Sequence, residues 1–271
     1  MMQDEATSEQ QSVQVAPELP DDVRGALAGF AIGLGDDALV LGHRLSEWCG
    51  VGPTLEEDIA LSNIALDLIG RADGFLTIAG QLEGGGRSAD DLAFLRDATD
   101  YRNVALVELP KGDFAFTIVR QFLFDALALP LSEWIAANPC PLAGVAAKAV
   151  KESRYHVRHS SEWVRRLGGG TDESHTRAQF AIDELWMYTE ELFDFGPDTV
   201  LLVEACQAPP PDSIRTQWNA TVEGVLGEVG LVIPEVKFHF TGARVGRHTE
   251  YLGHMLSEMQ ILPRSHPGAE W

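Results

Sequence analysis

The sequence has few cysteines and few basic residues for its length. Its three cysteines, Cys49, Cys140 and Cys206, lie far apart, and no two of them form a Cys-x-x-Cys pair. Such a sparse, odd set indicates free thiols in a reducing compartment and argues against a disulfide framework. Lys and Arg number 20 against 41 Asp and Glu, which gives a formal net charge of −21. A surface of this charge repels nucleic acid and anionic membranes, so we expect neither as a partner.

Signals for targeting and for membrane insertion are also lacking. Residues 1–20 are polar and acidic without the apolar stretch of a signal peptide, and we expect them to form a disordered tail. No apolar run approaches the roughly 20 residues that a transmembrane helix needs. With 45% hydrophobic residues over 271 positions, the chain can bury a large core. We therefore expect a cytoplasmic protein with a single helical domain over residues 21–271.

Helical periodicity dominates the chain after residue 20. We expect helices over residues 21–49, 54–83, 89–98, 114–137, 142–167, 171–195, 211–230 and 250–262. Gly29, Gly33 and Gly35 predict a kink or break in the first helix, and residues 231–249 predict a short extended segment. The second helix is apolar nearly all round, which predicts burial on several sides. Short turns at 50–54 and 138–141, with one long crossover between the second and third long helices, predict an all-α, ferritin-like four-helix bundle with extra C-terminal helices.

A ferritin-like bundle raises the question of a two-metal centre. Such a centre takes one Glu from each of two helices and a Glu-x-x-His motif from each of the other two, because several carboxylates must neutralise the cations. No Glu in this sequence is followed three residues later by His. In the nearest approximations, Ser153 stands where His156 needs a glutamate, and Ile64 and Asp67 occupy the other motif. We therefore predict no metal ligand, no cofactor and no catalytic residue in this chain.

We expect a structural polar cluster to remain where a related bundle holds metal. Its predicted members are Asn63, Asp67, Glu152, Ser153 and His156. Glu152 and His156 are four residues apart, a spacing that favours an ordinary ion pair or hydrogen bond. Asn63 and Asp67 lie in a helix with little expected solvent face, so they need buried partners. The basic residues expected to be able to neutralise Asp67 are Arg71, Arg120, Lys148 and Arg154.

Four stretches of the sequence resemble one known family closely. They are RLSEWCG (44–50), LDLIGRA (66–72), KESRYHVRHSSEWVRRLGGGTDES (151–174) and HTEYLGHMLSEMQ (248–260). In order and spacing they are similar to the C subunits of the bacterial multicomponent phenylacetyl-CoA epoxidases, and the likeness extends from about residue 26 to Trp271. The resemblance implies a ferritin-like fold and membership of a complex that epoxidises the aromatic ring of phenylacetyl-CoA with O2 and electrons from NADPH.

The resemblance also implies a role without catalysis. In this family the di-iron centre lies in the A subunit, a reductase delivers electrons, and the C subunit binds and stabilises the A subunit. No iron-binding role carries over to Ile64, Asp67, Ser153 or His156. Two alternatives stay open: an active di-iron oxygenase or ferroxidase with unusual ligands, and a separate module that binds a CoA ester. The negative charge and the lack of a basic cluster in the sequence argue against the second alternative.

Overall fold

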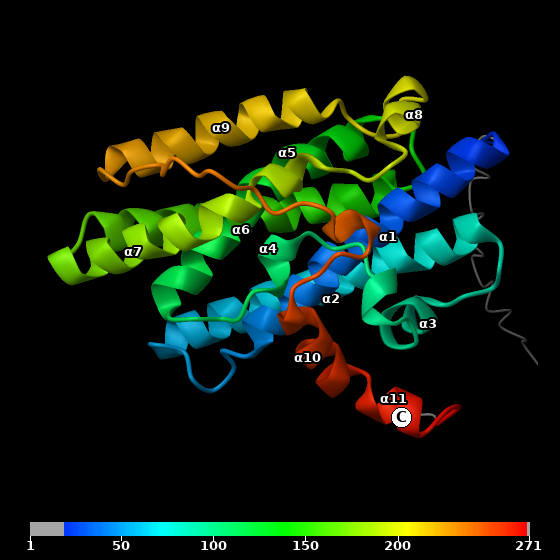
Figure 1. The fold of residues 1–271 in the computed structure, drawn as a ribbon, viewed down its shortest axis with the longest axis horizontal. Helices are drawn as coiled ribbons and strands as arrows, with labels where there is room; N and C mark the ends of the chain where they lie inside the picture. The colour runs from blue at the N-terminus through cyan, green and yellow to red at the C-terminus, as the bar shows by residue number, and fades with distance from the viewer. Residues whose placement is uncertain (1–18, 270–271) are drawn as a thin grey trace, which may run out of the picture.

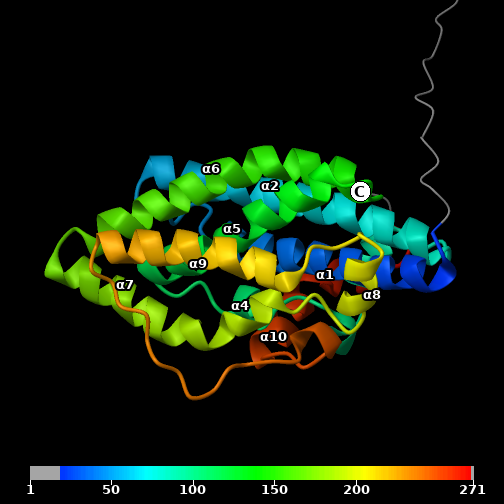
Figure 2. The same ribbon diagram turned by 90° about the horizontal axis from the view of Figure 1, so that it is seen from above.

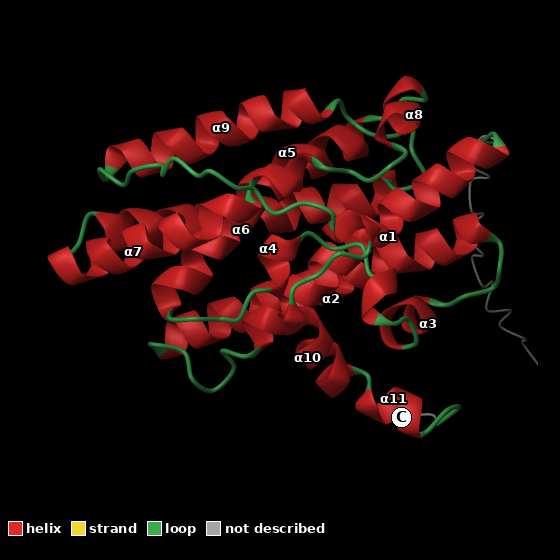
Figure 3. Cartoon of the chain, viewed as in Figure 1, coloured by secondary structure: helices red, strands yellow, loops and turns green. Residues whose placement is uncertain are grey.

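A computed structural model describes residues 19–269, and within that range every regular element is helical (Figures 1 and 3). The long helices are α1 (Asp21–Ser46), α2 (Leu55–Glu83), α5 (Phe114–Ala137), α6 (Ala143–Gly168), α7 (Asp172–Leu185) and α9 (Pro211–Glu228). The short helices are α3 (Ala89–Phe94), α4 (Ala105–Glu108), α8 (Thr199–Glu204), α10 (Glu250–Met259) and α11 (Ile261–Ser265). Single 3-10 turns occur at Ala98–Asp100, Trp186–Tyr188, Glu190–Phe193 and Ala243–Val245. The all-α prediction is confirmed.

Two helical hairpins, α1–α2 and α5–α6, form the four-helix bundle (Figure 1). Seen from above, α2 and α6 lie side by side on one face, and α1 and α5 lie beneath them (Figure 2). Helices α7 and α9 pack against α5 and α6, while the long crossover from α2 to α5 carries α3 and α4. One long crossover after the second helix is the ferritin-like arrangement, as the sequence predicted.

Local capping residues set the ends of the long helices. The side chain of Thr54 accepts a hydrogen bond from the Glu57 amide at the start of α2, and Gly84 ends that helix with φ of 69°. Asp113 caps α5 in the same way through the Phe116 amide, at 2.8 Å. These signals lie within a few residues of the helix ends, so the predicted bounds of α5 are confirmed.

The predicted break in α1 does not occur, and two of its glycines serve close packing. Helix α1 is continuous from Asp21 to Ser46. A Cβ atom at Gly29 would lie 2.6 Å from Nη1 of Arg102, and one at Gly35 would lie 2.7 Å from Cδ2 of Leu76. No larger residue fits at these two positions without displacing a neighbour, so the glycines allow close approach of other segments to the helix.

The predicted burial of α2 on several sides is also wrong. The side facing α1 and the bundle interior is buried, but Leu55, Ile59 and Leu66 are 73%, 52% and 65% exposed. Spacings of four and seven residues place these three side chains on one face of the helix. Apolar residues therefore cover the outer face of α2 as well as its inner one.

Buried apolar side chains form a large core inside the bundle. Helices α1 and α5 are long and apolar enough by composition to cross a membrane, and most of each apolar stretch is buried within the fold, as the core helices of a bundle are. Residues 231–249 form a loop that contains one 3-10 turn and no strand. The predicted disordered tail, residues 1–20, lies outside the described residues except for its last two.

Candidate functional site

The structure brings most of the predicted polar cluster together between α2 and α6. Asp67 contacts His156 across this interface, and Glu152 and Ser153 lie on the adjoining turn of α6. Asn63 is exposed on the outer face of α2, so its predicted membership is wrong. We call the group Asp67, Arg71, Asp125, Glu152, Ser153 and His156 the central cluster.

The central contact is a hydrogen bond between His156 and Asp67. His156 is fully buried, and its Nε2 lies 3.1 Å from Oδ2 of Asp67. Burial, together with the positive charge of Arg71 and the neighbouring His159, lowers the pKa of His156 to about 3. A neutral imidazole therefore donates its Nε2 proton to the Asp67 carboxylate at neutral pH, because an ionised carboxylate can only accept.

Arg71 supplies the positive charge at this interface. Its side chain is buried, and Nη2 lies 3.4 Å from Oε2 of Glu152 and 3.5 Å from the Ala149 carbonyl oxygen. Lys148 reaches the other oxygen of Glu152 at 3.5 Å. The predicted pairing of Glu152 with His156 is therefore wrong, because both carboxylate oxygens of Glu152 face cations instead.

The expectation that a basic residue neutralises Asp67 holds only in part. Burial raises the pKa of Asp67, and the charges of Arg71 and Lys148 act against that rise. The other two candidates are engaged elsewhere: Arg154 pairs with Glu133 at 2.9 Å, and Arg120 donates to the carbonyl oxygens of residues 109 and 110. The direct partner of Asp67 is a neutral histidine.

Sequence reasoning missed Asp125, which α5 contributes to the central cluster. Its carboxylate accepts hydrogen bonds from Gln121 Nε2 at 2.7 Å and from Ser160 Oγ at 2.9 Å. Complete burial raises the pKa of Asp125 to about 7. The signal was present, since Asp125 is a lone acid within the apolar stretch FAFTIVRQFLFDALALPL.

Several buried atoms around the central cluster have no hydrogen-bond partner among residues 19–269. They are Arg71 Nε, Gln121 Oε1, Ser153 Oγ, His156 Nδ1 and His159 Nδ1. His159 itself approaches Glu57 through Nε2 at 2.9 Å. Unpartnered buried polar atoms cost stability, so this region is not optimised for packing alone.

The residues of the central cluster do not fit a pair of iron ions. Among residues 19–269, no three His, Cys, Asp or Glu side chains converge closely enough to hold a metal. Ile64 is apolar and fully buried, and Ser153 offers an uncharged hydroxyl in place of a carboxylate. The guanidinium of Arg71 lies within the cluster and would repel a metal cation.

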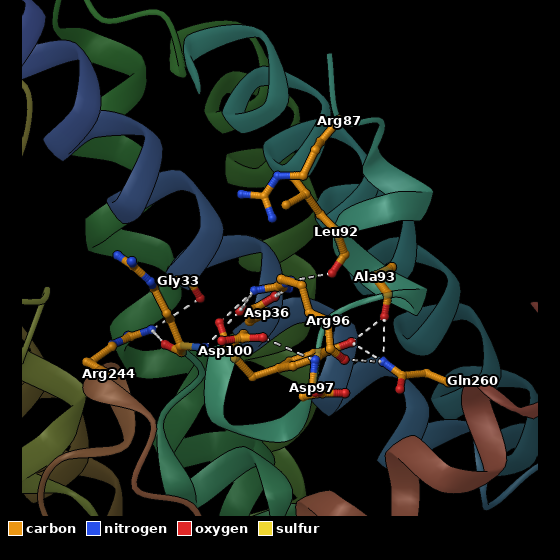
Figure 4. A network of polar contacts seen from close by, with 12 residues as sticks. Gly33, Asp36, Arg87, Leu92, Ala93, Arg96, Asp97, Asp100, Arg244 and Gln260 are labelled. Atoms are coloured by element: carbon orange, nitrogen blue, oxygen red, sulfur yellow. Dashed lines mark hydrogen bonds and ion pairs between the residues drawn. The ribbon is translucent and has the colours of Figure 1, made fainter. Parts of the chain in front are cut away.

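A second buried polar group, also missed from the sequence, lies on α1. Asp36 pairs with Arg96 at 3.0 Å (Figure 4). Asp37 pairs with Arg244 at 2.8 Å. We call these four residues the α1 network. It ties the crossover before α5 and the C-terminal loop to the first helix. Two adjacent aspartates inside the apolar stretch AIGLGDDALVLG were the available signal.

Comparison with known proteins adds to this geometry. A sequence model of the family described as "Phenylacetic acid catabolic protein" matches residues 3–271. The chain is also 46% identical over 246 residues to the C subunit of the 1,2-phenylacetyl-CoA epoxidase from Escherichia coli (strain K12). That alignment covers 90% of this chain and 99% of the bacterial protein.

Proposed function

Because this chain belongs to the phenylacetic acid catabolic protein family, we propose that it is the structural, non-catalytic subunit of a phenylacetyl-CoA epoxidase complex. In this proposal it acts in the cytoplasm, in aerobic phenylacetate degradation. It binds and stabilises a catalytic A subunit that carries the di-iron centre, and the complex includes a reductase. The similar bacterial protein is one subunit of an epoxidase, which supports membership of such a complex.

The composition of the central cluster is the observation that carries the non-catalytic role. Two cations bound by a bundle need several carboxylates around them, and here a buried arginine occupies the same interface. His156 is oriented by Asp67 and held neutral by burial, which gives it a structural hydrogen bond. In this proposal, the contacts between Asp67 and His156 and between Arg71 and Glu152 join α2 to α6 without a metal.

The outer face of α2 supports a docking role. A helix that is apolar all round is normally covered on all sides, yet Leu55, Ile59 and Leu66 are exposed in the isolated chain. Their partner would be an apolar helical face on the catalytic subunit. Around Leu66, the exposed neighbours on this outer face are the uncharged residues Asn63 and Gly70. An uncharged centre is typical of the desolvated core of an interface.

Co-expression with the catalytic subunit tests the docking role. The double variant I59E/L66E places two carboxylates in the proposed interface, and we expect the two subunits to separate on gel filtration. The matched control is V200E, which changes a 70% exposed apolar residue on α8, and it should co-elute with the partner as the wild type does. If the double variant co-elutes normally, α2 is not the docking face. If the wild type fails to associate, the structural-subunit proposal fails.

The alternative, an active di-iron protein with unusual ligands, makes an opposite prediction about metal. Elemental analysis of chain purified from iron-rich medium should find no stoichiometric iron. One or two iron ions per chain, lost in the H156A variant, would instead establish a centre at the central cluster.

A further inference from the structure

A polar pocket of about 500 Å³ opens beside α1, where the crossover and the C-terminal loop meet. Four arginines line it: Arg87, Arg96, Arg102 and Arg244. Arg87, Arg96 and Arg102 come from the crossover between α2 and α5, and Arg244 comes from the C-terminal loop, so the fold adds a fourth cation that lies far away in the sequence. In a chain with 20 basic residues and a net charge of −21, this gathering is unusual.

Two of these arginines form a fixed floor. Arg96 and Arg244 are each only 6% exposed, and Asp36 and Asp37 neutralise them. Arg244 also donates to the carbonyl oxygens of Gly33 and Arg102, at 3.1 and 2.7 Å. In Figure 4, Arg87 lies above the Asp36–Arg96 pair and Arg244 lies to its left. Nearly all N–H donors of Arg96 and Arg244 are already hydrogen-bonded. These two side chains therefore shape the pocket and offer no free charge to a ligand.

Arg102 differs from the other three. Its backbone is held at both ends, because its amide donates to Asp36 Oδ2 at 2.8 Å and its carbonyl oxygen accepts from Arg244. The residue is half-buried, and its guanidinium forms no hydrogen bond or ion pair with any of residues 19–269. The guanidinium lies against α1 at Gly29, where only the absence of a side chain leaves room for it.

The other charged residues that line the pocket determine its net charge. Arg87 faces the pocket from its rim and is paired with Glu83, at 3.0 Å. Asp100 is exposed at the rim and keeps a weak contact with the Asp97 amide, at 3.3 Å. Within the described part of the chain, Arg102 is therefore the cation of the lining without an ion-pair partner. Two carboxylates line the same pocket: Glu83, which Arg87 engages, and Asp100, which pairs with no cation among residues 19–269. Because Asp100 faces water, its repulsion of an anion is screened.

We propose that this pocket binds a phosphate-bearing anion, with the Arg102 guanidinium as its principal contact and Arg87 as a second cation. A guanidinium presents parallel N–H donors that match two phosphate oxygens, and it stays charged at all physiological pH values. A volume of about 500 Å³ accommodates a diphosphate or the phosphate end of a nucleotide. The site does not depend on the docking face of α2 or on the absence of iron.

Isothermal titration calorimetry on the full chain tests this site, with inorganic pyrophosphate as the main ligand. Parallel titrations with inorganic phosphate and with coenzyme A distinguish a free anion from a nucleotide-borne phosphate as the source. We expect saturable binding of pyrophosphate or coenzyme A by the wild type. The R102A variant should lose about tenfold or more in affinity, since a charge-assisted bidentate contact is removed.

Two further variants make the test specific. D100N removes the opposing charge and can keep the contact with the Asp97 amide, so affinity should rise about two- to fivefold. R177A removes an exposed arginine on α7 that pairs with Glu173 and Asp113, and it should leave affinity unchanged. Circular dichroism confirms that each variant is folded. The proposal is overturned if the wild type binds none of the three ligands, or if R102A and R177A bind equally well.

Discussion

The central cluster and the α1 network are two buried polar groups in one bundle, and they differ in how fully their atoms are hydrogen-bonded. In the α1 network every carboxylate oxygen is bonded: Arg96 and the Arg102 amide serve Asp36, while the Val104 amide and Arg244 serve Asp37. In the central cluster, Arg71 Nε, Ser153 Oγ and His156 Nδ1 have no partner among residues 19–269.

This difference in hydrogen bonding indicates that the two groups contribute differently to stability. In the α1 network, every charged group has a hydrogen-bonded partner of opposite charge, and these partners lie far away in the sequence. The α1 network therefore holds α1 to the crossover and to the C-terminal loop. In the central cluster, by contrast, several buried polar atoms have no such partner among the described residues. Its polar residues stabilise the α2–α6 interface less completely than the α1 network stabilises α1.

The largest expected loss of stability comes from removing an ion pair of the α1 network. The variant R244M leaves the buried Asp37 carboxylate without its ion-pair partner and removes the donor to the Gly33 carbonyl oxygen. We expect the free energy of unfolding to fall by about 3–5 kcal/mol, measured by urea denaturation. The control R166M removes an exposed arginine paired with Glu162 and should cost less than about 1 kcal/mol. Equal losses in the two variants would contradict this role of the α1 network.

The central cluster should make the stability of the protein depend on pH. His156 has a folded pKa of about 3, below its ordinary value of 6.5, so the unfolded chain binds the proton more readily between these values. Stability from this residue is present above pH 6.5 and is lost on acidification through that window, by about 1.4 kcal/mol per pH unit.

The H156Q variant isolates this contribution, because glutamine can still donate to Asp67 but does not titrate. Between pH 6.5 and pH 4.5 the wild type should lose about 3 kcal/mol more than H156Q, measured by urea denaturation at each pH. The variant H254Q, at an exposed histidine of α10, should follow the wild type. If the free energies of unfolding of the wild type and H156Q depend on pH in the same way, the pKa of His156 is not lowered in the folded protein.

The comparison also shows what the sequence can and cannot reveal. The ends of α5 and the start of α2 follow from capping residues only a few positions away, so they were predictable. The missing Glu-x-x-His motif was likewise readable, since it is a local spacing. The partners of Asp36 and Asp37 lie 60 and 207 positions away, and no local pattern specifies such pairings.

The predicted burial of the outer face of α2 also failed, for a physical reason. Hydropathy reports that Ile59 and Leu66 avoid water, but it cannot say whether their cover comes from the same chain or from another. Asn63 was placed in the interior for the same reason, because the helix around it is apolar. A helix whose outer face belongs to an interface looks like a core helix in the sequence.

A smaller effect is expected at Asp125, with the opposite dependence on pH. Its folded pKa of about 7 lies above the ordinary value of 3.8, so stability from this group falls as pH rises from about 4 to 7. The D125N variant keeps an acceptor for Gln121 and carries no charge. We expect it to be about 2 kcal/mol more stable than the wild type at pH 8, and similar to it at pH 4. Thermal denaturation at both pH values measures this, and a less stable variant at pH 8 would contradict a destabilising buried charge.

The smallest expected effect compares two serines of α6. Ser153 and Ser160 are both fully buried, but Ser160 Oγ donates to Asp125 at 2.9 Å whereas Ser153 Oγ has no partner among the described residues. The change to alanine removes the same atom in each case. S160A should lose about 1–2 kcal/mol, because it leaves a buried acceptor short of a donor. S153A should change stability by less than about 0.5 kcal/mol or increase it, because it removes a hydroxyl that is buried without compensation. Chemical denaturation of both variants at pH 7 measures the difference. Equal losses would mean that Ser153 is hydrogen-bonded in solution, and the central cluster would then be as well satisfied at this position as the α1 network.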